Sequence, residues 1–279
     1  IFLLNIIIYL IYVYIYQPTS FGNIFGFSSD ISNFIFIISI LFLFFLGIID
    51  DKIDLPASIR FLILVIIIGI NLSINQQINI STIKLSFYDP FLINNYSFFW
   101  TLLCFLLLIN AFNFFDGINL QISGLIFSFC LFFIIKNIFY NFFIAIIIVN
   151  LFFIYLNYKS KTFLGNNGSF FLPFLFGALF ISAYNNSNEI YSDEIVILML
   201  IPGMDLLRLF FQRILKKKNP FKGDKEHIHH YLMKNYSTNL SAFIIQLMIW
   251  VPFILFQLYG SFLLAFIIQV CSYIFIISK

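Results

Sequence analysis

Residues 31–49 read ISNFIFIISILFLFFLGII, and Asp50, Asp51 and Lys52 follow them directly. A helix needs about 20 mainly apolar residues to cross the hydrocarbon core of a bilayer, and this stretch has that length and composition. Charged side chains avoid the bilayer centre, so a charged triplet suits the point where a helix leaves the membrane. The pattern predicts a spanning helix whose last turn carries two adjacent carboxylates.

The rest of the chain has the same composition. Its 279 residues are 62% hydrophobic and 10% charged, whereas soluble domains carry about 25% charged residues. We therefore expect an all-α, polytopic membrane protein with one transmembrane domain over 1–279 and no nucleic-acid partner. Ten apolar segments are predicted spans: residues 1–16, 31–49, 59–75, 97–112, 120–136, 138–156, 169–184, 193–214, 240–257 and 260–278.

The basic residues predict which side faces the cytoplasm, because cytoplasmic loops hold the excess of Lys and Arg. When the ten segments alternate and the loop after the second lies inside, 13 of the 15 basic residues fall inside. Only Lys84 and Lys136 fall outside, and all three histidines fall inside. The polar chemistry is therefore expected at the cytoplasmic face.

Four polar motifs lie at that face, and the first is Asp50-Asp51. Adjacent carboxylates at a membrane boundary are costly unless a divalent cation or a proton transfer uses their charge. The alternative is an ordinary solvated helix end.

The second motif is Asn110, Asn113 and Asp116, whose spacing of three places them on one helical face. It suits a sugar or nucleotide and a metal, and the alternative is hydrogen bonding between helices.

The third motif is the turn Gly165-Asn166-Asn167-Gly168, just before the seventh predicted span. Glycine-rich turns at a helix N-terminus can offer backbone N–H groups to phosphate, although Asn-Gly is also ordinary turn chemistry.

The fourth motif runs from Arg213 through a lysine-rich stretch to His227, His229 and His230. It lacks cysteine and a standard zinc spacing, so it fits pyrophosphate better than zinc. The lysines alone could also hold anionic lipid headgroups.

The four motifs, in this order, resemble the polyprenyl-phosphate N-acetylhexosamine-1-phosphate transferase family, of the glycosyltransferase family 4 type. The resemblance covers residues 47–230. Pro220-Phe221, Asp224 and the three histidines resemble the branch that starts O-antigen, enterobacterial common antigen or teichoic acid synthesis. It implies a multi-pass protein of the inner (plasma) membrane that transfers the sugar-1-phosphate of a UDP-N-acetylhexosamine to a polyprenyl (undecaprenyl) phosphate. UMP is released and Mg²⁺ is required.

The resemblance also implies roles for individual residues. Asp50, Asp51, Asp116 and His229 are the expected catalytic residues, with Asp50 accepting or assisting transfer of the acceptor's proton. The expected Mg²⁺ ligands are Asp116 and Asn166. The residues expected to hold the substrates are Asn110, Asn113, Gly165, Arg213, His227 and His230. Either direct transfer or a covalent aspartyl step satisfies this reaction. Which UDP-sugar is used, and whether the protein forms a homodimer, stay open.

This chain departs from the family pattern at several positions. Asn166 stands where relatives have an aspartate that binds magnesium, Asn119 replaces a second aspartate, and Leu64 replaces a common glutamine. Loss of the carboxylate at Asn166 should weaken metal binding. The family also starts with a further helix and a Pro-Arg-Gly-Gly type loop, so we expect an N-terminal helix before Ile1.

Three other functions are alternatives for a chain of this composition. The murein-precursor phospho-N-acetylmuramoyl-pentapeptide transferases form a neighbouring branch with a different histidine region. A transporter would more often carry ionisable residues near the bilayer midplane, which these segments almost lack. A CDP-alcohol phosphatidyltransferase is rejected, because Asp116-Gly117 is not followed by that family's Ala-Arg pattern.

Overall fold

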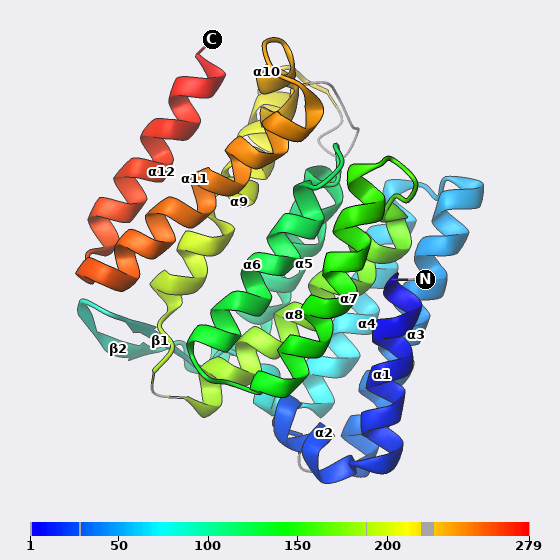
Figure 1. Ribbon diagram of the computed structural model, residues 1–279. Helices are drawn as coiled ribbons and strands as arrows, with labels where there is room; N and C mark the ends of the chain where they lie inside the picture. Colours follow the sequence, from blue (N-terminus) through cyan, green and yellow to red (C-terminus); the bar gives the residue numbers. More distant parts are fainter. Residues whose placement is uncertain (1, 28, 188, 219–225, 279) are drawn as a thin grey trace.

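The computed structural model describes residues 2–27, 29–187, 189–218 and 226–278, and its described part is dominated by helices (Figure 1). The elements, in chain order, are α1 (Phe2–Tyr16), α2 (Pro18–Phe25), α3 (Asp30–Ile53), α4 (Ala57–Ile74), η1 (Gln76–Ile78), β1 (Thr82–Leu85), β2 (Tyr88–Leu92), η2 (Asn94–Tyr96), α5 (Ser97–Phe115), α6 (Gln121–Ile135), α7 (Tyr140–Tyr158), α8 (Gly165–Asn186), α9 (Ser192–Leu215), α10 (Ile228–Met233), α11 (Thr238–Tyr259) and α12 (Phe262–Ile277). The all-α prediction is confirmed.

Each of the ten predicted segments forms a helix. Among the described residues, six helices are long and apolar enough to cross a membrane, namely α3, α4, α5 with its preceding turn, α7, α8 and α11. The pair α1–α2, bent by 117°, would make a seventh. The apolar helices α6 and α12 have 15 and 16 residues, so each is shorter than the roughly 30 Å hydrocarbon core at about 1.5 Å per residue. The chain is a multi-pass membrane protein.

The outward faces of the helices are apolar, as lipid requires. Along α3, Phe42, Phe45 and Ile49 are exposed, while Leu43 and Leu46 are buried in the protein. A soluble protein would place polar residues on the outer face of such a helix. The exposed apolar face of α3 therefore supports a position against lipid.

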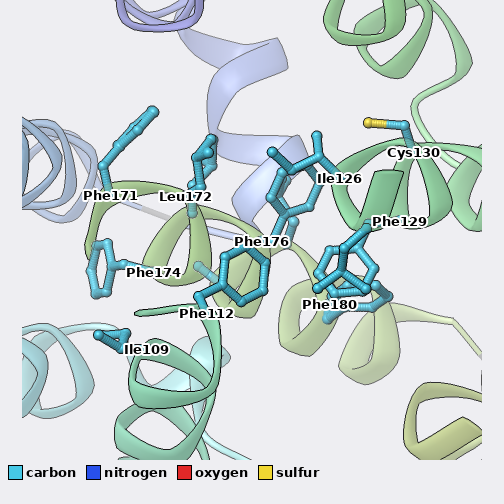
Figure 2. Close-up of a cluster of buried hydrophobic side chains, with 14 of the residues drawn as sticks. Ile109, Phe112, Ile126, Phe129, Cys130, Phe171, Leu172, Phe174, Phe176 and Phe180 are labelled. Atoms are coloured by element: carbon cyan, nitrogen blue, oxygen red, sulfur yellow. The ribbon is translucent and has the colours of Figure 1, made fainter. Parts of the chain in front are cut away.

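Helix α8 forms the centre of the structure. All its residues from Gly168 to Tyr184 are buried, and it packs against α2, α3 and α5. Figure 2 shows part of this core, where Phe176 and Phe180 of α8 lie beside Phe129 of α6, with ring centroids 5.4 and 5.0 Å apart. Since α8 is packed on several sides, its first turn is held in a fixed position beside α3 and α5.

Helix α2 and the β1–β2 hairpin are among the structured regions that lie outside the predicted spans. Helix α2 follows the sharp bend after α1, and the β1–β2 hairpin is antiparallel, with Thr82 opposite Leu92. Lys84 fixes the hairpin to the end of α8, because its Nζ donates to the carbonyl oxygens of Tyr184 and Ser187, each at 2.7 Å. The hairpin lies at the end of the bundle opposite to α10 (Figure 1).

Candidate functional site

The four polar motifs meet at one end of the bundle. The ends of α3, α5 and α9, the starts of α4, α6 and α8, and helix α10 all lie at this end (Figure 1). Alternation of the helix directions brings these segments together, although they are far apart in the sequence. Pro220, Phe221 and Asp224 of the fourth motif lie outside the described residues.

Asp50 is buried in the last turn of α3 and ties three segments together. Its Oδ2 accepts hydrogen bonds from Arg60 Nη1 at 3.0 Å and from Asn166 Nδ2 at 2.8 Å. Its Oδ1 accepts from the backbone N–H of Leu55 at 2.9 Å. The charge of Asp50 is therefore balanced by Arg60, and its role as a proton acceptor stays a prediction.

Asp51 lies against the first turn of α8. Its Oδ1 accepts the backbone N–H of Asn166 at 3.1 Å. Gly165 has a φ of +73°, and a Cβ there would lie 2.8 Å from Asp51 Oδ2. Glycine is required for both reasons, since it adopts positive φ easily and leaves room for the carboxylate. The sequence predicted that backbone N–H groups in the first turn of α8 could bind phosphate. At least one of them, that of Asn166, donates to Asp51 instead.

Asn113 connects α5 to the same turn. Its Nδ2 donates to Asn166 Oδ1 at 3.0 Å and to Ser169 Oγ at 3.1 Å. Asn110, one turn earlier, donates to the backbone of Leu106 and lines a cavity of about 40 Å³ together with Arg60 and Asn113. That volume holds about one water molecule. The role of Asn110 in holding a substrate stays a prediction.

Asp116 is the C-cap residue of α5, and its charge interacts with that of Asp51. Burial, and then the negative charge of Asp51, raise the pKa of Asp116 to about 7. Two carboxylates that share a site in this way favour a proton or a cation between them. The following loop is fixed to the end of α7, because Asn119 donates to Ser160 Oγ at 2.7 Å and Asn157 accepts the N–H of Leu120 at 2.6 Å.

The histidines reach the site from α10 and the residue before it. His229 is buried against Gly117, where an added Cβ would lie 2.1 Å from its Cε1. Burial, followed by the neighbouring His230 and His227, lowers the pKa of His229 to about 3. His229 is therefore neutral at pH 7, and its buried Nδ1 has no hydrogen-bond partner among the described residues. The His230 ring centroid lies 4.2 Å from that of His229.

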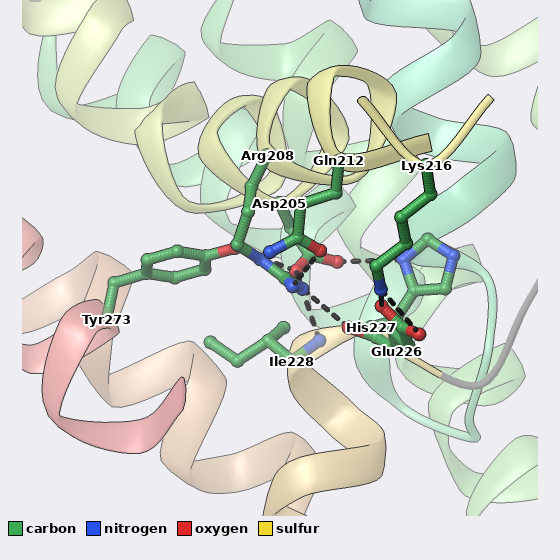
Figure 3. Close-up of polar contacts among 8 residues, drawn as sticks. All are labelled: Asp205, Arg208, Gln212, Lys216, Glu226, His227, Ile228 and Tyr273. Carbon is green, nitrogen blue, oxygen red and sulfur yellow. Dashed lines mark hydrogen bonds and ion pairs between the residues drawn. The ribbon is translucent and has the colours of Figure 1, made fainter. Parts of the chain in front are cut away.

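Arg213 and His227 complete this side of the site. Arg213 is buried in the last turn of α9, with its guanidinium 5.2 Å from the centre of the Phe114 ring. His227 lies 5.6 Å from the same ring and makes a 2.8 Å hydrogen bond through Nδ1 to Asp205 of α9 (Figure 3). Phe114, in the second motif, is thus the apolar surface on which two groups of the fourth motif rest.

Comparison with known proteins identifies the family of this chain. The family model described as Glycosyl transferase family 4 matches residues 33–184, which is more than half of the chain. The chain belongs to this family. The matched range contains Asp50, Asp116 and Asn166, whereas the three histidines lie beyond it.

Named relatives are similar over a longer stretch. A probable undecaprenyl-phosphate N-acetylglucosaminyl 1-phosphate transferase of Bacillus subtilis (strain 168) is 30% identical over 202 residues, covering 67% of this chain and 54% of the relative. The undecaprenyl-phosphate alpha-N-acetylglucosaminyl 1-phosphate transferase of Escherichia coli (strain K12) is 27% identical over 216 residues, covering 73% and 59%. The protein of that name from Yersinia pestis is 26% identical over 218 residues, with the same coverage. The chain thus spans somewhat more than half the length of these relatives.

The expected Mg²⁺ site of this family 4 chain can be tested against the side chains present. In the described ranges, no group of three His, Cys, Asp or Glu residues could hold a metal ion alone. Mg²⁺, however, normally takes one or two carboxylates and completes its shell with phosphate and water. Asp51 and Asp116 fit that requirement, because the negative charge of Asp51 helps to raise the pKa of the buried Asp116 carboxyl, and a bound cation would relieve that repulsion. Asn166 fits less well, since Oδ1 accepts from Asn113 and Nδ2 donates to Asp50.

Sequence reasoning missed Arg60 and Asp205 as parts of the site. Arg60 was counted only as a cytoplasmic charge, although it is the ion-pair partner of Asp50. Asp205 lies within the predicted eighth span, three residues before Arg208. A carboxylate inside an apolar helix is costly, and this signal could have identified Asp205. All the site residues that the sequence did predict lie at this same end of the bundle.

Proposed function

We propose that this chain is the membrane-embedded part of an enzyme that transfers N-acetylhexosamine-1-phosphate from a UDP-sugar to polyprenyl phosphate. An oxygen of the polyprenyl phosphate attacks the phosphorus that carries the sugar. The bond from that phosphorus to UMP breaks, and UMP leaves with the electron pair. The relatives support this reaction, since their names specify undecaprenyl phosphate as acceptor and an N-acetylglucosaminyl 1-phosphate group. A UDP-N-acetylglucosamine type donor is thus the first to test.

One observation carries the proposal: Asp51 and Asp116 interact through their charges at the end of the bundle where His229 packs against Gly117, the residue after Asp116. Phosphoryl transfer needs charge neutralisation and exact positioning more than covalent chemistry from the protein. The carboxylate pair suits a divalent cation, and buried Arg213 and His227, which both lie against the Phe114 ring, suit a diphosphate. The basic residues that cluster at this end support a cytoplasmic position for the proposed site, because cytoplasmic loops hold the excess of Lys and Arg.

We assign each of these residues a separate role in the proposed reaction. Asp51 and Asp116 would hold Mg²⁺, which when bound neutralises charge on the diphosphate. Asp50 orients Asn166 and Arg60 through its hydrogen bonds, and takes or relays the acceptor's proton with Asp51. His229 presents neutral ring nitrogens next to the Asp116–Gly117 turn. Arg213 offers a fixed positive charge that Phe114 supports through a cation–π contact.

An apolar groove of about 440 Å³ favours a lipid acceptor. It lies between α5 and α9, where Phe112, Met199 and Leu206 are among its lining residues. The exposed side chains of Leu107 and Leu207 on its rim show that it opens at the protein surface. A hydrocarbon chain in this groove would approach the polar end of the bundle from within the bilayer.

A transporter is less well supported. Helices α5, α6, α7, α8, α11 and α12 contain no Asp, Glu, Lys or Arg. A polar path for a charged solute across the bilayer would need such groups near the midplane. Among the described residues, the charged clusters lie instead at the two ends of the bundle.

The test is release of UMP by the full-length protein in membranes, with polyprenyl phosphate and a panel of radiolabelled UDP-sugars. Turnover should require Mg²⁺, and Asp51→Asn and Asp116→Asn should each lower kcat by at least about 100-fold. Asp50→Asn separates a proton-transfer role from a positioning role. Asp89→Asn, on the exposed strand β2 at the other end, is the matched control and should leave turnover unchanged.

Two results would reject the proposal. One is absence of UMP release with every UDP-sugar tried, while the protein is folded in the membrane. The other is full turnover in Asp51→Asn and Asp116→Asn. Turnover only with a UDP-N-acetylmuramoyl-pentapeptide donor would assign the chain to the murein-precursor reaction instead.

A further inference from the structure

Asp205 is a buried carboxylate at which three separate parts of the chain converge (Figure 3). Its Oδ1 accepts three hydrogen bonds, from Arg208 Nη2 at 2.9 Å, from Tyr273 Oη at 2.9 Å and from the backbone N–H of Ile228 at 3.1 Å. Its Oδ2 makes one side-chain contact, to His227 Nδ1 at 2.8 Å. The two oxygens of the Asp205 carboxylate thus have different partners: Oδ1 accepts from three donors, and Oδ2 contacts the His227 ring.

The Oδ2 contact determines where His227 carries its proton. An ionised carboxylate can only accept hydrogen bonds, so Nδ1 must be the protonated nitrogen of the neutral ring. The ion pair with Arg208 keeps Asp205 in its charged form. Nε2 is then the ring nitrogen that can accept a hydrogen bond from a ligand, or donate one when the ring is protonated.

The contacts of Asp205 Oδ1 hold the segment that follows His227, which is the start of α10. The N–H of Ile228 is the first of α10, so its bond to Asp205 anchors the start of this helix. Arg208 adds a second link, because its Nη2 also donates to the carbonyl oxygen of Glu226 at 2.5 Å. The anchored ring of His227 lies parallel to that of His229, with an interplanar angle of 4° and centroids 5.5 Å apart. His229 in turn rests on Gly117, beside Asp116.

From this geometry we infer that Asp205 is a positioning residue of the transferase site, which sets the tautomer and the ring plane of His227. It contacts no substrate itself. It holds Nδ1–H of His227 at Oδ2 and the first turn of α10 at Oδ1, so that the histidines meet the Asp116–Gly117 turn in one orientation. The catalytic consequence rests on the proposed function, whereas the tautomer itself does not.

Asp205→Asn gives a sharp test, because the structure dictates how the new amide must lie. Three donors surround the position of Oδ1, so the amide oxygen has to occupy it. The amide Nδ2 must then replace Oδ2 and point its N–H at His227 Nδ1. His227 can satisfy that donor only by accepting at Nδ1, which moves the proton of the neutral ring to Nε2.

The experiment uses ¹⁵N-histidine NMR at pH 8 on the full-length protein in nanodiscs, purified without a histidine tag. The chain has three histidines, and a His227→Gln variant assigns the signal. The wild type should show protonated Nδ1 and unprotonated Nε2 at His227, and Asp205→Asn should show the reverse. In the same samples kcat for UMP release should fall about 10–100-fold, the range typical for loss of an orienting partner.

Two controls separate positioning from general destabilisation. Asp193→Asn replaces another buried carboxylate of α9, at the far end of the helix, and should keep both the tautomer and kcat. Tyr273→Phe removes one donor from Oδ1 but leaves Oδ2 with His227, so it should also keep the tautomer.

The outcomes are distinct. An Nε2–H tautomer in the wild type, which can be measured even if the variant does not fold, would overturn the inference. So would an unchanged tautomer in folded Asp205→Asn, or a reversed tautomer with full turnover. If the tautomer reverses as expected but the wild type releases no UMP, the proposed function fails and the assignment of the tautomer stands.

Discussion

Gly47 of α3 lies directly against the backbone of Asn167 in the first turn of α8. A Cβ built on Gly47 would lie 2.1 Å from Cα and 2.2 Å from N of Asn167. No side chain fits at that distance, and a backbone neighbour cannot rotate away. The absence of a side chain at Gly47 therefore lets α3 and α8 approach closely enough for Asp50 and Asn166 to share a hydrogen bond.

Gly47→Ala should displace the first turn of α8 and disconnect Asn166 from Asp50. Overpacking of this kind costs about 1–3 kcal/mol, so both the thermal midpoint and the rate of UMP release should fall. Gly69→Ala in α4 is the control, because a Cβ there meets only a ring carbon of Phe98 at 3.8 Å. Equal thermal midpoints and rates for the two variants would contradict the packing argument.

Asn166→Asp should restore a carboxylate beside the proposed metal site. Its side chain would face Asp50 Oδ2, which now receives Nδ2 of Asn166 at 2.8 Å. Without Mg²⁺ the two carboxylates repel each other, so the variant should unfold at a lower temperature than the wild type. With Mg²⁺ the added ligand should lower the metal concentration needed for half-maximal turnover.

The measurement is a Mg²⁺ titration of both turnover and thermal midpoint, in the wild type and in Asn166→Asp. Asn94→Asp introduces the same charge in the exposed turn η2, just after the hairpin, and controls for net charge. An unchanged Mg²⁺ requirement in Asn166→Asp would mean that this position does not take part in metal binding.

The raised pKa of Asp116 predicts how stability depends on pH. Its pKa is about 7 in the folded chain and 3.8 without the fold. Between these values the folded state binds more protons than the unfolded state, so the contribution of Asp116 to stability falls as pH rises from about 4 to 7. In EDTA, Asp116→Asn should therefore raise the thermal midpoint more at pH 8 than at pH 5. The same shift at both pH values would show that the Asp116 carboxylate is not under electrostatic strain.

The helices could be predicted because each rests on a local property, an apolar stretch of sufficient length. The meeting of the four motifs could also be expected, since alternation of spans sends Asp50, Asp116, Gly165 and Arg213 to the same side. The bend after α1 and the β1–β2 hairpin could not be predicted in this way. Both depend on contacts with distant residues, such as those of Lys84 with the end of α8.

The individual side-chain contacts of the site could not be predicted from local sequence patterns either. The sequence assigns Asp50 and Asn166 to separate motifs, and only the packing of α3 on α8 shows that their side chains are bonded. The same holds for Asp205 and His227, which a helix end and a loop separate in the sequence. Spacing placed Asn110 on the same face of α5 as Asn113, but it could not give the size of the cavity beside it, which is about 40 Å³ in this structure.

The charge asymmetry gives a prediction for the topology that is independent of turnover. Lys217, after α9, should face the cytoplasm, and Asp89, on the hairpin, should face the opposite side. In intact cells a membrane-impermeant maleimide should label Asp89→Cys and leave Lys217→Cys unlabelled until the cells are lysed. The parent chain measures the background from Cys104, Cys130 and Cys271, of which only Cys271 is exposed. Labelling of Lys217→Cys in intact cells would place the carboxylates and histidines on the outer side, where no UDP-sugar donor is made.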